Sequence, residues 1–228
     1  MAQLIDPRGH RTAIIGITGS GKTYYAIQLF RAIPFNALYI DYAAAIRRND
    51  WAAPLRPLVV HDCAGVLRAW QANKRVNPNA PAKAVFEPVR GGDSPDKVIR
   101  WIMNWKQGVQ APKPIWVFCD EIHNYGDRNQ HPDVGELFTR GRNSNVTGVA
   151  ITQNLPQVGN TAIIQNCQVK ICFSLDQAAV RALARNYSII VPDTVLAWVN
   201  QQAELRPPTR TAYNAAVYGL TGPEWRMI

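Results

Sequence analysis

The feature that most constrains the fold is the glycine-rich segment at residues 12–23, which reads Thr-Ala-Ile-Ile-Gly-Ile-Thr-Gly-Ser-Gly-Lys-Thr. Its last eight residues match G-x-x-x-x-G-K-[ST]; an apolar run precedes them, and a helical pattern follows at residues 24–31. Backbone N–H groups of such a loop converge with those at the start of a helix and favour an anion there. An ordinary glycine-rich turn is the alternative, but the flanking patterns favour a nucleoside triphosphate site.

The residue types in this segment predict individual roles. Lys22 is expected to meet the β- and γ-phosphates of ATP, and the Thr23 hydroxyl is expected to ligate Mg²⁺. The loop residues expected to surround the phosphates are Gly16, Thr18, Gly19, Ser20, Gly21, Lys22 and Thr23.

The composition is that of a globular protein with a basic surface. The chain has 228 residues, of which 47% are apolar and 18% are charged, and we expect one domain spanning residues 1–228. A net charge of +9 points to a polyanionic partner, with nucleic acid the first candidate. The four cysteines form no C-x-x-C pair and are expected to be reduced core thiols. No signal-peptide core or membrane-length apolar run is visible, so a soluble, intracellular protein is expected.

The order of the predicted elements indicates the fold class. Apolar runs predict strands at residues 13–15, 37–41, 58–60, 84–86, 115–119, 146–152, 169–175 and 211–218. Helical patterns cover residues 24–31, 64–76, 95–108, 176–186 and 192–201, and residues 42–56 are expected to form a loop or short helix. Strands that alternate with helices predict a three-layer α/β domain with a mostly parallel central sheet.

A second motif follows the continuous apolar run at residues 115–119, which ends in Asp120 and Glu121. An acidic residue at the end of such a strand is where a phosphate-loop protein holds Mg²⁺, so Asp120 is the expected carboxylate on the metal side. Glu121 is expected to orient and deprotonate a water molecule in line with the γ-phosphate. The alternative is that both residues only cap a helix.

A third motif joins two arginines to the strand predicted at residues 146–152. Gln153 follows this strand and is the candidate sensor of the γ-phosphate or the attacking water, with a plain loop amide as the alternative. Arg140 and Arg142 are placed at a turn before the strand, where one of them can act across a subunit interface on the transition state. A surface ion pair or a DNA contact remains open for both, and Arg142 is slightly favoured.

Together these segments resemble the FtsK/HerA superfamily of ring-forming DNA-pumping ATPases. The resemblance rests on the phosphate loop, on Asp120-Glu121, and on residues 140–153 (Arg-Gly-Arg-Asn-Ser-Asn-Val-Thr-Gly-Val-Ala-Ile-Thr-Gln) followed by Leu155-Pro156. The chain looks most like the genome-packaging ATPases of tailless icosahedral viruses with an internal membrane. The membrane or DNA-orienting domains of larger bacterial relatives and the nuclease domain of terminases are not seen.

The resemblance implies a RecA-like core, ATP and Mg²⁺ as ligands, and a homo-oligomeric ring, expected to be a hexamer, that drives double-stranded DNA through its pore. It implies that Glu121 activates water, that Gln153 is the sensor, and that Arg142 or Arg140 acts in trans. It also implies the host cytoplasm or a packaging vertex as the location, with a capsid-vertex or membrane protein as a further partner.

Several points stay open at this stage. Candidate DNA contacts are Arg47-Arg48, Lys74-Arg75 and Arg128, each equally readable as a solvated surface charge. The competing functions are a small-molecule kinase, which Glu121 argues against, and a nucleotide-switched assembly or export factor like the filamentous-phage morphogenesis proteins.

Overall fold

The computed structural model describes residues 10–108, 114–127, 129–201, 214–219 and 222–228. Within these residues the chain forms one nine-stranded sheet with the order β3-β4-β2-β5-β6-β1-β7-β8-β9. The strands are β1 (Thr12–Ile15), β2 (Asn36–Ile40), β3 (Val59–Val60), β4 (Lys83–Phe86), β5 (Ile115–Cys119), β6 (Val146–Thr152), β7 (Val169–Cys172), β8 (Ala216–Tyr218) and β9 (Trp225–Met227). All pairs from β3 to β7 are parallel, and β8 and β9 add antiparallel pairs at one end.

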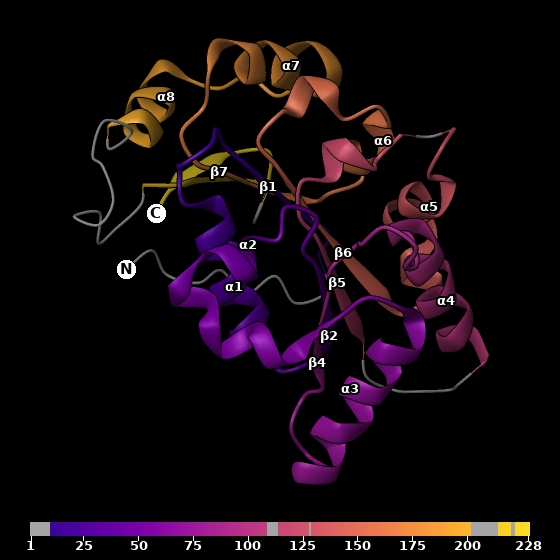
Figure 1. Ribbon diagram of the computed structural model, residues 1–228. Helices are drawn as coiled ribbons and strands as arrows, with labels where there is room; N and C mark the ends of the chain where they lie inside the picture. The colour runs from indigo at the N-terminus through magenta and orange to yellow at the C-terminus, as the bar shows by residue number, and fades with distance from the viewer. Residues whose placement is uncertain (1–9, 109–113, 128, 202–213, 220–221) are drawn as a thin grey trace.

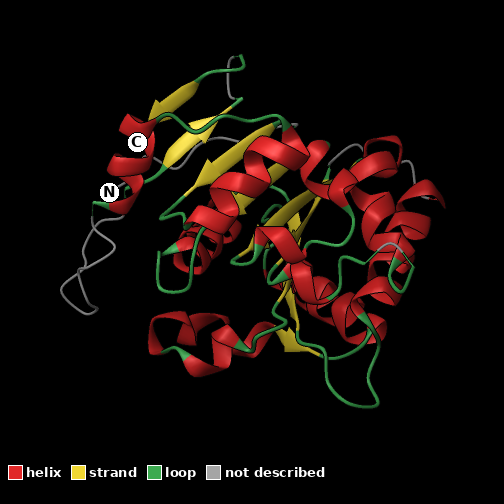
Figure 2. Ribbon diagram, turned by 90° about the horizontal axis from the view of Figure 1, so that it is seen from above, coloured by secondary structure: helices red, strands yellow, loops and turns green. Residues whose placement is uncertain are grey.

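Helices cover both sides of this sheet (Figures 1 and 2). They are α1 (Lys22–Ala32), α2 (Ala45–Arg48), α3 (Cys63–Val76), α4 (Pro95–Gly108), α5 (Pro132–Arg140), α6 (Thr161–Gln165), α7 (Gln177–Tyr187) and α8 (Asp193–Asn200). Short 3₁₀ segments are η1 (Asp50–Leu58), η2 (Ile122–Asn124), η3 (Gly141–Ser144) and η4 (Leu155–Gln157). The three-layer α/β architecture with a mostly parallel sheet is therefore confirmed.

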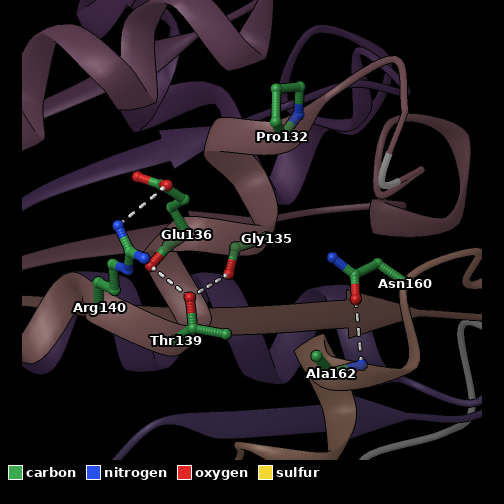
Figure 3. Close-up of a pocket in the computed structure, with 7 residues that line it drawn as sticks. All are labelled: Pro132, Gly135, Glu136, Thr139, Arg140, Asn160 and Ala162. Atoms are coloured by element: carbon green, nitrogen blue, oxygen red, sulfur yellow. Dashed lines mark hydrogen bonds and ion pairs between the residues drawn. The ribbon is translucent and has the colours of Figure 1, made fainter.

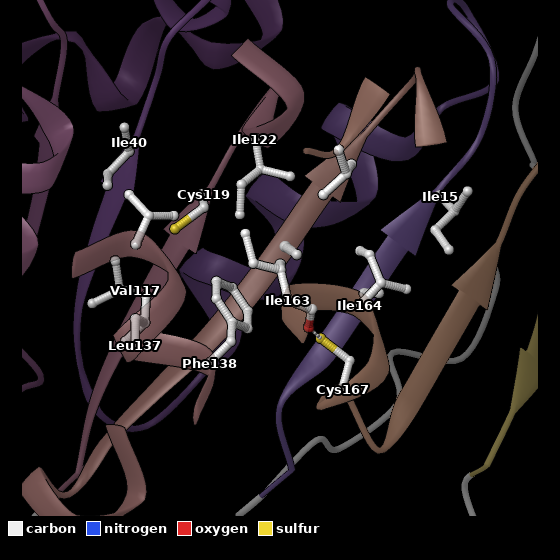
Figure 4. Packing of buried hydrophobic residues seen from close by; sticks show 14 of the residues in the cluster. Ile15, Ile40, Val117, Cys119, Ile122, Leu137, Phe138, Ile163, Ile164 and Cys167 are labelled. Atoms are coloured by element: carbon white, nitrogen blue, oxygen red, sulfur yellow. Dashed lines mark hydrogen bonds between the residues drawn. The ribbon is translucent and has the colours of Figure 1, made fainter. Parts of the chain in front are cut away.

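The central strands are buried on both faces, which explains why they are continuous apolar runs in the sequence. Successive side chains of a strand point to opposite faces, so β1 contributes Ile15 to one core and Ile14 to the other. The core that contains Ile14 packs under α1 and η1. The core that contains Ile15 packs under α3 to α8, and Figure 4 shows Phe138 and Leu137 of α5 against strand residues there.

The main differences from the predicted elements concern short segments. Helices α5 and α6 and strand β9 were not predicted, and β7 ends at Cys172 where a strand to residue 175 was expected. Helix α5 is weak in sequence because Gly135 and Thr139 are poor helix formers. Packing of its buried face on α4 and α6 compensates for that weakness. The last predicted strand is β8, and its expected first residues, 211–213, lie outside the described residues.

The contact between β6 and α5 gives a test of the packing. A Cβ at Gly148 would lie 2.7 Å from Cε1 of the fully buried Phe138. We expect Gly148→Ala to lower the free energy of unfolding by about 1–3 kcal/mol, measured by urea denaturation, because the ring has no free space to move into. The matched control is Gly222→Ala, where a Cβ meets no atom within 4 Å. Equal stabilities of the two variants would contradict this packing.

Candidate active site

The loop between β1 and α1 is held in a shape that requires glycine at three positions. Gly19 and Gly21 have φ angles of +77° and +96°, in the left-handed region that side chains disfavour. A Cβ at Gly16 would lie 2.6 Å from Ser20 Oγ and 2.8 Å from Phe173 Cβ. Backbone bonds from Gly16 N to Thr152 O (3.2 Å) and from Ile17 N to Ser174 O (2.9 Å) fix the loop between β6 and β7.

The same loop leaves room and donors for an anionic group. A Cβ at Gly19 would meet no atom within 4 Å, so the space next to this backbone is open. Ser20 Oγ is buried and has no hydrogen-bond partner among the described residues. Lys22, in the first turn of α1, is buried as well. These features fit a phosphate chain.

Lys22 also interacts with carboxylates from a different strand. Burial lowers the pKa of Lys22, and the negative charges of Glu121 and Asp120 oppose that shift. The sheet explains the arrangement, because β6 lies between β1 and β5 and pairs with both in parallel. At strand spacings near 4.8 Å, β1 and β5 are about 10 Å apart. The Lys22 side chain therefore meets the charges of Glu121 and Asp120 across the end of β6.

The strand register brings the predicted motifs to one edge of the sheet. Ile15 pairs with Thr152, and Cys119 pairs with Ala150. Counting on from these pairs, Gly16 is level with Gln153 and Glu121 is level with Thr152. The phosphate loop, the carboxylate pair and Gln153 therefore meet at the carboxyl edge, although the phosphate loop precedes the other two by about a hundred residues or more in the sequence.

Asp120 is enclosed by hydrogen bonds. Its Oδ2 accepts from the Tyr39 hydroxyl at 3.0 Å, and its Oδ1 accepts from the Glu121 backbone N–H at 3.0 Å. Burial, with the nearby charge of Glu121, raises the pKa of Asp120 to about 7. No cluster of three or more His, Cys, Asp or Glu in the described part of the chain could hold a metal ion alone. Mg²⁺ is usually bound by one or two carboxylates together with phosphate oxygens, and Asp120 offers a carboxylate of that kind.

Glu121 has an unusual backbone and an unsatisfied side chain. Its φ angle is +50°, a conformation that non-glycine residues adopt only where the surroundings hold them. The carboxylate accepts from the Gln153 backbone N–H, and burial raises its pKa while Lys22 opposes the shift. Its Oε2 is buried without a hydrogen-bond partner in the described residues. A carboxylate held this way, facing a phosphate site, has the chemistry of a general base.

Gln153 touches the phosphate loop directly. Its side-chain Oε1 accepts a hydrogen bond from the Thr18 hydroxyl, which joins the end of β6 to the tip of the loop. A phosphate bound in the loop would compete with this contact. The geometry therefore suits a residue that responds to the state of the bound nucleotide.

Sequence reasoning did not single out Tyr39 and His123. Tyr39 is a fully buried tyrosine in β2, and its hydroxyl donates to Asp120. Its place in an apolar strand was the available signal, because a buried tyrosine hydroxyl usually needs a hydrogen-bond partner. His123 Nδ1 lies 3.2 Å from Thr152 Oγ1 and 3.4 Å from Glu121 Oε2. Its position two residues after Glu121 was the available signal.

The two arginines lie elsewhere. Arg140 is the last residue of α5 rather than a turn residue; its exposed side chain pairs with Glu136 at 3.6 Å beside a shallow pocket (Figure 3). Arg142 lies in η3, and its side chain is outside the described residues. Both precede β6, whose seven residues span about 23 Å to the edge with Gln153. The backbone of both arginines therefore lies at the edge of the sheet opposite the phosphate loop of the same chain.

The candidate DNA contacts differ from one another. Arg47, exposed on α2, forms an ion pair with the buried Glu87. Asp41 begins α2 by accepting backbone N–H bonds from Ala45 and Ile46 at 2.7 and 2.8 Å. Lys74 donates instead to backbone carbonyls in the loop after α3. Arg128 lies outside the described residues.

Comparison with solved structures finds proteins of the same fold. The genome packaging NTPase B204 from Sulfolobus turreted icosahedral virus 2, in complex with AMPPCP, is 13% identical, with a TM-score of 0.61 over 98% of this chain and 97% of that one. VirB4 of Thermoanaerobacter pseudethanolicus is 10% identical, with a TM-score of 0.60 over 100% and 92%. The pCW3 conjugation coupling protein TcpA is 14% identical, with a TM-score of 0.53 over 97% and 60%. Neither the protein-family models nor the curated proteins give a match.

The strand order, the glycine loop and these similarities define the class as a RecA-like P-loop NTPase fold. These structural neighbours share the RecA-like fold that the sequence resemblance implied. No helix in the described part of the chain combines the length and apolar character needed to cross a bilayer.

The environment of Asp120 predicts a pH dependence of the nucleotide-free protein. Its pKa rises from an ordinary value of 3.8 to about 7 in the folded protein, so between these pH values the folded state binds a proton that the unfolded state has lost. The contribution to stability is thus lost as the pH rises from about 4 to about 7. We expect the free energy of unfolding of Asp120→Asn, measured by urea denaturation, to rise by on the order of 1–3 kcal/mol relative to the wild type across this pH range. A difference that stays constant with pH would contradict the buried, protonated carboxyl.

Proposed function

We propose that this protein is an ATPase that moves double-stranded DNA, independently of sequence, and packages a viral genome into a preformed capsid. The observation that carries the proposal is the meeting of Lys22, Glu121 and Gln153 around one glycine loop at the carboxyl edge of the sheet. We further infer that residues 1–228 act as a single P-loop ATPase domain within a homo-oligomeric ring, most simply a hexamer.

In the proposed reaction, the loop from Gly16 to Thr23 binds the phosphates of ATP through its backbone N–H groups, and Lys22 neutralises the β- and γ-phosphate oxygens. Glu121 accepts a proton from a water molecule, and the oxygen of that water attacks the γ-phosphorus while the bond to the β–γ bridging oxygen breaks and ADP leaves with that oxygen. Thr23 and Asp120 would hold Mg²⁺, which when bound would supply positive charge that stabilises the phosphates. Gln153 exchanges its contact with Thr18 for one with the γ-phosphate or water.

The choice of DNA rests on charge and on the neighbouring structures. The net charge of +9 suits a polyanion whose backbone phosphates are bound without regard to sequence. The B204 structures, which are of a genome packaging NTPase in complex with AMPPCP and with ATP-gammaS, match this chain almost end to end. This supports ATP as the substrate and packaging in the host cytoplasm, at a vertex that offers a capsid or membrane protein as partner.

A second candidate is DNA transfer between cells, favoured by the similarity to TcpA, a conjugation coupling protein. The similarity is weaker, since this chain covers 60% of TcpA. A nucleotide-switched assembly factor is the non-motor alternative. A small-molecule kinase is disfavoured, because a carboxylate poised to activate water would waste ATP.

ATP hydrolysis measured with and without double-stranded DNA tests the proposal. We expect DNA to stimulate phosphate release, and Glu121→Gln to lower turnover by about 10²–10⁴-fold because the base is lost. Lys22→Ala should abolish nucleotide binding. Lys97 is a surface lysine paired with Asp93, and Lys97→Ala should leave nucleotide binding and turnover unchanged. A phosphorylated metabolite as product would favour the kinase, and turnover indifferent to DNA would favour the assembly factor.

The trans arginine is tested by mixing subunits. Arg142→Ala is expected to lower turnover by roughly 10³-fold while leaving nucleotide affinity unchanged, because the side chain would act on a neighbour's transition state. Arg140→Ala is the matched comparison. Mixed rings of Lys22→Ala and Arg142→Ala subunits should regain part of the activity, since some interfaces then join an intact loop to an intact arginine. Full activity of Arg142→Ala would move the assignment to Arg140 or to neither.

A further inference from the structure

The buried histidine of η2 lies between the two halves of the proposed active site. The side chain of His123 is only 7% exposed. Its Nδ1 is 3.2 Å from Thr152 Oγ1, on the last residue of β6, and 3.4 Å from Glu121 Oε2, after the end of β5. A single ring nitrogen thus faces both the proposed base and the strand that carries Gln153.

Without the His123 ring, the Glu121 carboxylate lacks a complete set of hydrogen-bond donors. Its carboxylate accepts the Gln153 backbone N–H, but Oε2 is buried with no hydrogen bond in the described residues. Leaving a buried carboxylate oxygen unsatisfied is costly, so a donor within reach has a strong reason to turn toward it. Among the described contacts, His123 Nδ1 is the side-chain nitrogen that lies closest to Glu121 Oε2, at 3.4 Å.

The chemistry of the ring fixes which nitrogen carries the proton. Burial, with the positive charge of Lys22, lowers the pKa of His123, so the imidazole is neutral at pH 7 and has one N–H. A bare nitrogen lone pair at Nδ1 would be repelled by the Glu121 carboxylate. The proton therefore belongs on Nδ1, where Thr152 Oγ1, which also accepts from Asn154 N at 3.1 Å, can share it.

We propose that His123 is a positioning residue for Glu121. Its Nδ1–H donates a hydrogen bond to Thr152 Oγ1 in the conformation described. A small rotation of the ring redirects this hydrogen bond to Glu121 Oε2. The orientation of the base is thereby linked to the end of β6, which holds Gln153. This inference rests on the proposed ATPase function of the same site.

Two substitutions separate the Nδ1 contact from general packing. The amide nitrogen of Asn is as many bonds from Cα as Nδ1, whereas that of Gln corresponds to Nε2. We expect His123→Gln to lower kcat for ATP by about 10- to 100-fold, a usual cost of misplacing a catalytic group. The affinity for a non-hydrolysable ATP analogue should stay within about twofold, and His123→Asn should restore most of kcat.

The same substitution in a Glu121→Gln background tests whether His123 acts through the base. If it does, His123→Gln should lower the residual turnover of that variant by less than about twofold, because there is no carboxylate left to position. The proposal would be overturned by a further loss as large as in the wild type. It would also be overturned if His123→Asn and His123→Gln were equally impaired, or if analogue affinity fell in step with kcat.

A measurement independent of hydrolysis is the ¹⁵N spectrum of histidine-labelled protein, tractable because the chain has four histidines. The His123→Asn variant identifies the signal that disappears. We expect the neutral tautomer protonated at Nδ1; protonation at Nε2 would overturn the proposed contact even in an active enzyme. An inactive wild type with the Nδ1–H tautomer would instead overturn the proposed function and retain the contact.

Discussion

The arrangement depends on the burial of Lys22 beside two carboxylates that come from a strand on the far side of β6. A lysine out of water loses hydration, which is recovered only if negative charge lies nearby. Glu121 supplies that charge, and Asp120 adds to it when it is ionised, since burial raises the pKa of both carboxyl groups. Burial thus destabilises the charged forms of all three groups. A bound phosphate chain and a cation would stabilise these charged forms.

The parallel register of β1, β6 and β5 turns this electrostatic requirement into a geometry. Parallel strands end at the same edge, so three short polar motifs that follow three apolar runs are brought together without any local contact in sequence. The placement of β6 between the other two has a functional consequence. It gives the site a strand whose last residue, Thr152, contacts His123, and whose following residue, Gln153, contacts the phosphate loop and Glu121.

The edge of the sheet opposite the phosphate loop carries the two candidate arginines. Helix α5 and η3 precede β6 and present Arg140 and the backbone of Arg142 there, about one strand length from the phosphate loop. A residue at that edge can serve a phosphate site only in another subunit. The distance therefore makes ring assembly a condition for any catalytic role of these arginines, and a surface ion pair such as Arg140–Glu136 is what the isolated chain displays.

The sequence by itself determined the α/β class and the phosphate loop, because glycine conformations and strand–loop–helix order are local properties. It also determined Asp120 and Glu121 as a strand-end pair. Only the tertiary structure decided that β6 separates β1 from β5, that Tyr39 satisfies Asp120, and that His123 bridges Glu121 and Thr152. It also revealed α5, a helix whose weak local propensity is offset by packing. Pairing across a sheet and burial of polar groups are set by contacts between distant residues, which no local pattern encodes.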